Sequence, residues 1–320
     1  MTKPMTKKIA FEEHVMCPGF EEYWRTTVAD FDPSLLKQAI ARLADFGELR
    51  LEAMNRAGIE RAILSLSGPG MQAEPDVSKA IGMAREANEF LARQIERCPD
   101  RYGGFAHLAL QDPMAGADEL ERCMKELKFC GAMINGHTLG RYLDDPFFYP
   151  FWERAEALGA VIYLHPADPV AKIAALDGHP GLRRATWEWT VETASHALRL
   201  VFSGLFDRFP RAVLALGHLG ETLPYLLWRL DSRAKLYGVK LAKRPSDYIR
   251  EHIVVTTSGM CSAAPLHCAI SALGRERVMF SVDYPYEDAG EAAEFIETVP
   301  LDPGVRDDIC FNNAKKLFRI

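Results

Sequence analysis

The sequence predicts one α/β domain folded as a (β/α)₈ TIM barrel. Eight apolar runs of strand length alternate with stretches of helical periodicity along the 320 residues. Strands that alternate with helices pair in parallel through crossover connections, and eight of them close into a barrel. No repeat, low-complexity segment or Pro/Gly linker divides the chain, so we expect a single domain over residues 1–320.

The elements follow from hydrophobic periodicity. The predicted strands are 8–11, 62–66, 104–108, 131–135, 160–164, 212–216, 253–257 and 278–282. The predicted helices are 35–56, 78–97, 115–127, 151–158, 191–206, 221–236, 265–273 and 305–317. An open doubly wound sheet is the alternative, but it would need a glycine-rich phosphate turn after the first strand. Glu12-Glu13-His14 stands there instead.

Composition excludes several classes of protein. The formal net charge is −6 and no dense basic cluster occurs, so we expect no nucleic-acid partner. No apolar run is long enough to span a membrane, and the apolar segment 9–11 is too short for a signal-peptide core. The seven cysteines form no Cys-x-x-Cys pair, which indicates buried, reduced thiols in a cytoplasmic protein.

Polar side chains gather where the predicted strands end, and barrel enzymes build their sites there. Glu12 and His14 follow strand one and are two residues apart, so both leave the strand on the same face. His165 follows strand five, His218 strand six and Asp283 strand eight. Imidazoles and carboxylates together suit a divalent ion such as Zn²⁺ or Mn²⁺. The sequence therefore predicts a metal site inside the barrel.

His218 and Glu221 are three residues apart at the transition from strand six to a helix, so they can lie side by side. A carboxylate beside an imidazole orients it and raises its basicity. The pair could act in general acid/base catalysis or in metal binding. Alternatively, Glu221 could simply stabilise the N-terminus of the helix.

With these motifs, the chain resembles the amidohydrolase superfamily, in particular its branch of aromatic-acid decarboxylases. That branch includes enzymes for γ-resorcylate (2,6-dihydroxybenzoate), 2,3-dihydroxybenzoate, salicylate and 5-carboxyvanillate. The resemblance runs from Lys8 to Phe318 and rests on IAFEEH at 9–14, YLHP at 163–166, GHLGE at 217–221, FSVDYP at 280–285 and NAKKLF at 313–318. It implies an amidohydrolase-type barrel that acts as a carboxy-lyase.

The resemblance also implies roles for single residues. One divalent ion, Mn²⁺ or Zn²⁺ with Mg²⁺ as a third candidate, would be held by Glu12, His165 and Asp283, with His14 as an extra ligand. Asn135 stands where dinuclear relatives carry a carbamylated lysine, so a second ion is not expected. His218 with Glu221 would form the acid/base pair.

Substrate contacts are implied in the same way. Arg229 matches a carboxylate-binding arginine of the family, and Arg50 and Tyr286 match substrate-binding residues of the 5-carboxyvanillate enzyme. The segments 135–138, which includes Asn135 and His137, and 140–144 also resemble that enzyme. The segments 177–180 and 186–187, in contrast, resemble the γ-resorcylate enzyme. The substrate therefore stays open between these two types.

The chemistry would be non-oxidative loss of CO₂ from an ortho-hydroxylated benzoic acid, leaving a phenol. The ring carbon is protonated before the C–C bond breaks, and the metal would hold the carboxylate and the ortho oxygen together. Asp283 is our first candidate for delivering the proton and His218 the second. Arginine suits the carboxylate, and Trp187, Phe20 and Tyr23 could stack on the ring.

Two alternatives remain at the level of sequence. A barrel of this kind could hydrolyse a lactone, ester or amide with a metal-activated water, or it could be a binding or structural protein. The second fits poorly because polar residues recur at one end of the barrel. The family is usually oligomeric, so we expect a homodimer or homotetramer in which Arg229 reaches the site of a neighbouring subunit.

Overall fold

The computed structural model describes residues 5–29 and 31–320. Residues 1–4 and 30, which the one-domain prediction includes, lie outside the described residues. The eight strands are β1 (Lys8–Val15), β2 (Ile59–Leu66), β3 (Tyr102–Gly104), β4 (Gly131–Asn135), β5 (Val161–His165), β6 (Val213–Leu216), β7 (Ile253–Thr256) and β8 (Val278–Met279). Each overlaps one of the strands that the sequence predicts, although β3 shares only Gly104 with the predicted strand 104–108.

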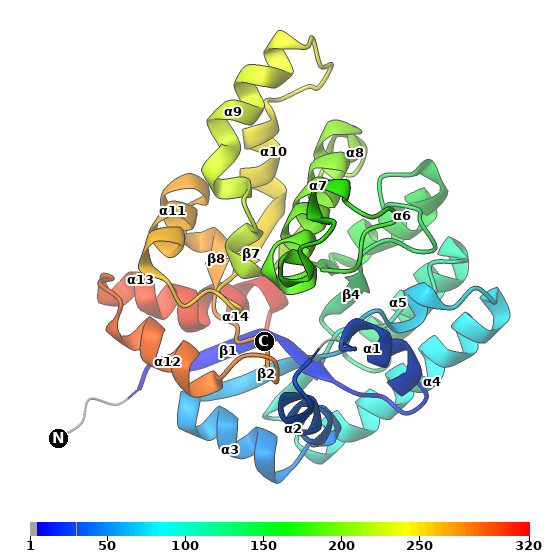
Figure 1. Cartoon of the computed structure of the whole chain (residues 1–320), viewed down its shortest axis with the longest axis vertical. Helices are drawn as coiled ribbons and strands as arrows, with labels where there is room; N and C mark the ends of the chain where they lie inside the picture. Colours follow the sequence, from blue (N-terminus) through cyan, green and yellow to red (C-terminus); the bar gives the residue numbers. More distant parts are fainter. Residues whose placement is uncertain (1–4, 30) are drawn as a thin grey trace.

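The strands close into a barrel (Figure 1). Parallel pairing runs in the orders β1-β2-β3 and β4-β5-β6-β7-β8. A parallel bridge between Ala106 and Ala132 joins β3 to β4, and one between Glu13 and Tyr284 joins β8 to β1. The predicted barrel is therefore confirmed.

Helices surround the strands. They are α1 (Glu21–Thr27), α2 (Pro33–Ala44), α3 (Glu48–Ala57), α4 (Val77–Arg97), α5 (Pro113–Lys125), α6 (Tyr149–Leu158), α7 (Glu188–Phe202), α8 (Leu205–Arg208), α9 (Leu223–Leu236), α10 (Pro245–His252), α11 (Ala263–Leu273), α12 (Ala289–Thr298), α13 (Pro303–Asp307) and α14 (Asn313–Phe318). Most of the predicted helices are confirmed, but α1, α10 and α12 were not predicted.

The predicted helix 35–56 is wrong in one respect, because the chain breaks it into α2 and α3. Asp45, after the last turn of α2, is extended, and Gly47 before α3 has φ −119° and ψ −113°. The predicted helix 305–317 is likewise divided, into α13, a π-helical turn and α14. Helical periodicity continues through both breaks, so periodicity alone did not reveal them.

Apolar side chains fill the lower part of the barrel interior. The Phe11 ring meets that of Phe105 edge-on with centroids 6.5 Å apart, and that of Phe318, from α14, at 5.0 Å. The interior cluster comprises Ile9, Phe11, Ile63, Phe105, Met133, Val161, Tyr163, Ala215, Val254, Met279 and Ala314. This packed layer is the floor on which the polar end of the barrel rests.

A β-bulge in β1 aims the polar residues inward. Ile9 and Phe11 belong to the interior cluster, so regular alternation would turn Glu12 outward. The pairing register with β2 shifts between Ala10 and Glu13, and Ser281 Oγ accepts hydrogen bonds from the amides of both Phe11 and Glu12. Since a bulge shifts the alternation by one residue, Glu12 and His14 face the interior.

Cysteines and helix lengths test two further expectations. All seven cysteines are free. Cys17 is buried and burial raises its pKa to about 12, so its thiol stays protonated and unreactive. Cys261, however, is exposed, and Cys98, Cys130 and Cys268 are half-buried, which corrects the prediction of buried thiols. In the part of the chain that the structure describes, every helix is too short or too polar to span a bilayer.

Candidate metal centre and catalytic cavity

A cavity of about 660 Å³ opens at the carboxyl ends of the strands. This is an ordinary size for a small-molecule site. His165, His218 and Asp283 lie in its wall together with loop residues from after β1, β2, β5 and β8. Polar strand ends and a cavity of this size thus coincide, as the sequence predicts.

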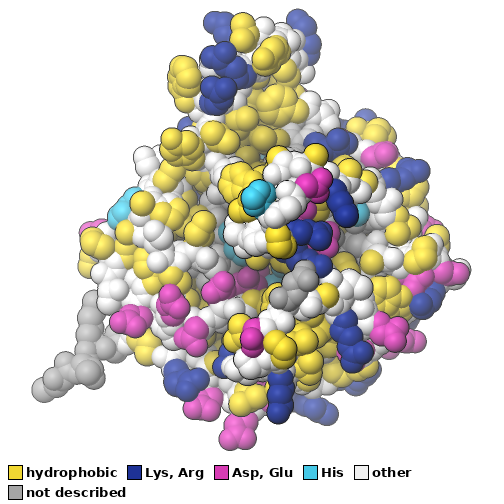
Figure 2. All heavy atoms as spheres, in the orientation of Figure 1, with side chains coloured by type: hydrophobic (Ala, Val, Ile, Leu, Met, Phe, Trp, Pro, Cys, Tyr) yellow, Lys and Arg dark blue, Asp and Glu magenta, His cyan; other side chains and the backbone are white. Residues whose placement is uncertain are grey.

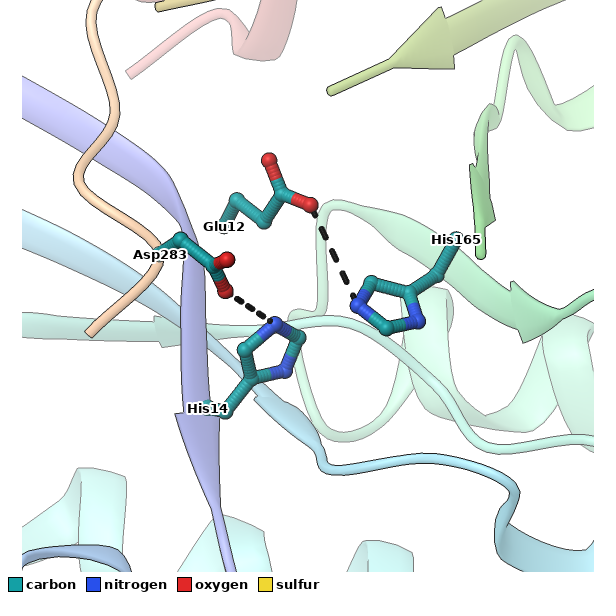
Figure 3. Close-up of side chains that lie close together, drawn as sticks. All are labelled: Glu12, His14, His165 and Asp283. Atoms are coloured by element: carbon teal, nitrogen blue, oxygen red, sulfur yellow. Dashed lines mark ion pairs between the residues drawn. The ribbon is translucent and has the colours of Figure 1, made fainter. Parts of the chain in front are cut away.

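Four side chains converge at the base of this cavity (Figure 3). Glu12, His14, His165 and Asp283 each offer a ligand atom, and these atoms lie within 4.8 Å of one another. His14 Nε2 lies 3.1 Å from Asp283 Oδ1, and His165 Nε2 lies 4.0 Å from Glu12 Oε1. All four predicted ligands are therefore brought together, from β1, β5 and the segment after β8.

The arrangement fits a divalent ion. Glu12 Oε1, His14 Nε2 and Asp283 Oδ1 are buried and accept or donate no hydrogen bond among the described residues, although the latter two lie 3.1 Å apart as an ion pair. A buried polar atom without a partner costs about 1–3 kcal/mol, so three such atoms in one cluster indicate that something else satisfies them. Two imidazoles and two carboxylates suit Zn²⁺ or Mn²⁺ better than Mg²⁺, which prefers oxygen ligands.

His14 and His165 favour their neutral forms and Glu12 favours its ionised form, and these are the forms that bind metals. Burial lowers the pKa of His14 to about 4 and that of His165 to about 3. Burial of Glu12 acts to raise its pKa, but its attraction to His218, with smaller interactions with His165, His14 and the hydroxyl of Ser258, outweighs it, so the pKa is lowered.

Asp283 and His218 favour their protonated forms. Burial and the charge of Glu12 raise the pKa of Asp283 well above its ordinary value, against the charge of His218. Burial acts to lower the pKa of His218, but the charges of Glu12, Glu221 and Asp283 raise it to about 9. In the metal-free chain, both predicted acids can therefore carry a proton near neutral pH.

Glu221 lies in the cavity wall and does not cap a helix. Helix α9 begins two residues later, after Thr222, and no side chain caps its N-terminus. Burial raises the pKa of Glu221, against the charge of His218 and a hydrogen bond with Thr190. Glu221 Oε1 has no hydrogen-bond partner among the described residues, so this carboxyl faces the cavity beside His218.

Three predicted substrate-binding residues line the cavity: Asn135, His137 and Tyr286. The Tyr286 hydroxyl accepts a hydrogen bond from Trp24 Nε1 at 2.7 Å and pairs with Ser67 Oγ at 2.5 Å. Its ring centroid lies 5.7 Å from that of His14. Tyr286 therefore presents its ring to the cavity while its hydroxyl is held from behind.

Other predicted contacts lie outside the cavity of this chain. Arg50 is buried below the loops, where it donates to the carbonyl of His14 at 2.6 Å and stacks over Tyr284 at 4.6 Å. Arg229 is exposed on the outer surface of α9, and Trp187 is exposed at the N-terminus of α7. This corrects the predicted placement of Arg50 and Trp187 in the substrate site. Arg50 is held away from the cavity by its hydrogen bond to the His14 carbonyl, and Trp187 faces solvent at the start of α7.

Phe20 and Tyr23, predicted to stack on the ring, pack in a separate apolar cluster with Cys17 and Met71. The cavity instead takes its aromatic wall from Phe31, Tyr286 and Trp189. Trp189 Nε1 donates to Asp168 Oδ1 at 2.7 Å, which fixes the indole.

Several cavity residues were missed from the sequence. Arg184 lines the cavity, and its guanidinium donates to the carbonyls of Thr26 and Thr27. Glu287 also lines it. The long segment between β5 and α7 carries no periodic signal for the placement of Arg184. Glu287, four residues after Asp283, could have been found by reading further along the loop after β8.

Comparisons with known proteins agree with this geometry. The sequence profile of the amidohydrolase family matches residues 30–320. A γ-resorcylate decarboxylase of Rhizobium radiobacter is 41% identical over an alignment of 327 positions, which covers 99% of this chain and 99% of the relative.

Two solved structures have the same fold. A dihydroxybenzoic acid decarboxylase from Polaromonas sp. JS666, with bound manganese and the inhibitor 2-nitroresorcinol, superposes with a TM-score of 0.93 at 40% identity, covering 98% of this chain and 97% of that one. A 5-carboxyvanillate decarboxylase from Sphingomonas paucimobilis gives 0.90 at 37%, covering 98% and 99%. This chain belongs to the amidohydrolase family, in its branch of aromatic-acid decarboxylases.

Proposed function

We propose that the chain is a metal-dependent, non-oxidative decarboxylase of an ortho-hydroxylated benzoic acid of the γ-resorcylate type. The observation that carries this is the convergence of Glu12, His14, His165 and Asp283 at the base of one cavity. The identity of 41% to γ-resorcylate decarboxylases supports that substrate over 5-carboxyvanillate. A solved 2,6-dihydroxybenzoate decarboxylase in complex with 2,6-dihydroxybenzoate superposes with a TM-score of 0.94.

The reaction needs a proton on the ring carbon before CO₂ can leave. A bound divalent ion would supply Lewis-acid chemistry and a template for the carboxylate and the ortho oxygen. Burial raises the pKa of Asp283 in the metal-free chain, and we assign this residue the transfer of a proton to the ring carbon. His218 lies beside it as the second candidate, with Glu221 stabilising its charged form.

We further propose Mn²⁺ as the native ion. The donor set of two imidazoles and two carboxylates accepts both Mn²⁺ and Zn²⁺, and manganese is bound in the related Polaromonas structure. The alternative of a lactone, ester or amide hydrolase has no specific observation in its favour, and the relatives compared here are decarboxylases.

Besides His218, the cavity of one chain offers few cationic side chains to an anionic substrate. Of the described residues that line it, Arg184 is the one arginine or lysine, and its guanidinium already donates to Thr26 and Thr27. We propose a homodimer or homotetramer in which Arg229 of a second copy supplies a carboxylate-binding fork. Cytoplasmic location remains our proposal as well, supported by seven free cysteines.

The test is a panel assay with metal-stripped protein that is reloaded with Mn²⁺ or Zn²⁺. The acids are 2,6-dihydroxybenzoate, 2,3-dihydroxybenzoate, salicylate and 5-carboxyvanillate, and the readouts are loss of substrate absorbance and release of CO₂. We expect turnover of 2,6-dihydroxybenzoate that a chelator abolishes and Mn²⁺ restores. Turnover of 5-carboxyvanillate alone would overturn the substrate assignment, and hydrolysis of lactones or amides without CO₂ release would overturn the reaction.

A further inference from the structure

Three hydroxyl groups surround one oxygen of the Glu12 carboxylate. Tyr163, from β5, donates to Glu12 Oε2 at 2.5 Å, and Thr256, from β7, does so at 3.2 Å. Ser258, two residues beyond Thr256, also donates to Oε2. The three residues are fully buried, so water does not compete for these hydrogen bonds.

The backbone of Gly217 packs against the Glu12 carboxylate. A Cβ atom at Gly217 would lie 2.7 Å from Glu12 Oε2 and 2.8 Å from Oε1, so the end of β6 leaves room for the carboxylate only because this residue is glycine. Oε1 has no hydrogen-bond partner among the described residues. It faces His165 Nε2 at 4.0 Å and His218 Nε2 at 3.7 Å. The two oxygens of Glu12 therefore have different environments.

The number of protons in this cluster limits which of these hydrogen bonds can form together. A carboxylate only accepts, and each hydroxyl has one proton to give. Tyr163 and Ser258 direct theirs to Oε2, while Thr256 Oγ1 lies 2.7 Å from Ser258 Oγ and 3.2 Å from the Tyr163 hydroxyl. Thr256 has a single proton, which it can give either to Oε2 or to one of these two hydroxyl oxygens, and in each case the network is satisfied without using Oε1.

Ser258 also contacts His218. Its Oγ accepts from the His218 amide at 3.2 Å, and its carbonyl lies 3.0 Å from His218 Nδ1. Because a carbonyl only accepts, Nδ1 carries a proton and Nε2 faces Glu12. Ser258 therefore contacts both the carboxylate of Glu12 and the predicted acid/base histidine, His218.

We propose that Tyr163, Thr256 and Ser258 are positioning residues that hold Glu12 by Oε2, so that Oε1 alone is presented to a metal ion. This inference deepens the proposed function, since it rests on the metal site of that function. Groups that hydrogen-bond a metal ligand typically contribute about 10–100-fold to metal affinity. None of the three lines the cavity, so their effect should reach the metal through Glu12.

The experiment compares Tyr163→Phe, Thr256→Val and Ser258→Ala with matched controls on α10, outside the barrel. Tyr248 and Ser246 are likewise buried and donate to carboxylates, those of Asp207 and Asp231, so Tyr248→Phe and Ser246→Ala lose the same groups. Metal-stripped proteins are titrated with Mn²⁺ and free ion is read by electron paramagnetic resonance. Thermal midpoints of the metal-free proteins are recorded in parallel.

We expect Tyr163→Phe and Ser258→Ala to bind Mn²⁺ about 10–100-fold more weakly. Ser258→Thr, which keeps the hydroxyl, should restore the affinity, and the α10 controls should bind as wild type whatever their thermal midpoints. Wild-type affinity in both Tyr163→Phe and Ser258→Ala, or an equal loss in the controls, would overturn the proposal. No substrate enters the titration, so failure of the decarboxylase assignment would leave this result readable.

Discussion

Asp283 combines an unusual backbone conformation with a central place in the candidate metal site. Its backbone lies in the left-handed region with φ 76°, where residues other than glycine pay about 1–2 kcal/mol but Asp and Asn are tolerated best. Its carboxyl is a candidate metal ligand, and burial raises its pKa in the metal-free chain. His218 and Glu221 also have positive φ angles, of 52° and 59°, and such backbone conformations cluster at functional sites.

The substitution Asp283→Asn should therefore keep the fold and lose the reaction. Asparagine has the same shape and accepts the left-handed backbone, but it cannot give up a carboxyl proton. We expect the thermal midpoint of the metal-free protein to stay near that of wild type while kcat falls about 10²–10⁴-fold. A kcat within a few-fold of wild type, measured at saturating Mn²⁺, would contradict the assignment of Asp283 as the acid.

At this scale the sequence predicted the ligands well and the substrate contacts less well. Glu12, His165 and Asp283 could be predicted because the carboxyl end of a barrel strand fixes where a side chain goes. Arg50 and Trp187 could not, because they stand on helices and loops whose direction depends on packing. Tyr163 and Ser258 could have been found, since each lies at an inward position two residues from another inward residue.

At the scale of elements, strand β1 sets the geometry of the site. Glu12 and His14 were predicted to lie on the same face of this strand, and in the structure they do. The sequence did not predict that Phe11 and Glu12 both face inward, because alternation forbids it without a bulge. The bulge depends on Ser281, whose hydroxyl accepts from two successive amides of β1. That contact joins β1 to the segment after β8 and has no signal in local sequence.

The other end of β1 is held by an ion pair. Lys8 is fully buried, and its ammonium donates to Glu297 Oε1, on α12, at 2.7 Å. Burial of Glu297 acts to raise its pKa, but hydrogen bonds from Lys8 and Thr6 outweigh it, so the pKa is lowered. This contact ties the beginning of β1 to α12.

We expect Glu297→Gln to lower the free energy of unfolding by about 1–2 kcal/mol at neutral pH, because a buried ammonium loses its charged partner. Since the folded pKa of Glu297 is lowered, its contribution is fully present above the ordinary value of 4.5 and is lost as pH falls through the folded pKa. Urea unfolding in steps below pH 4.5 should show the gap to wild type closing.

The matched control is Glu294→Gln, which removes an exposed carboxylate of the same helix and should leave the unfolding free energy unchanged. A gap between Glu297→Gln and wild type that stays constant down to low pH would assign the effect to packing of α12 instead of to the ion pair.

At the scale of the whole molecule, α9 and α10 project beyond the rest of the barrel (Figure 1). Hydrophobic side chains mixed with lysine and arginine cover this projection (Figure 2). Tyr225 is 84% exposed, Trp228 77% and Tyr237 78%. Exposed aromatic residues in such number are typical of a protein interface. Tyr225 and Trp228 lie three residues apart and Arg229 follows directly, so one helix presents all three.

This surface leads to the last prediction, which concerns assembly. If α9 forms the contact between copies, the double variant Tyr225→Ser, Trp228→Ser should shift the mass measured by light scattering toward a monomer, because large aromatic side chains carry most of the free energy of such contacts. Met114→Ser, which removes an exposed apolar side chain of α5, should leave the mass unchanged. Because we place Arg229 in the neighbouring site, a monomer should also bind 2,6-dihydroxybenzoate more weakly. A monomer of wild-type activity would show instead that each cavity is complete and that Arg229 has no role in it.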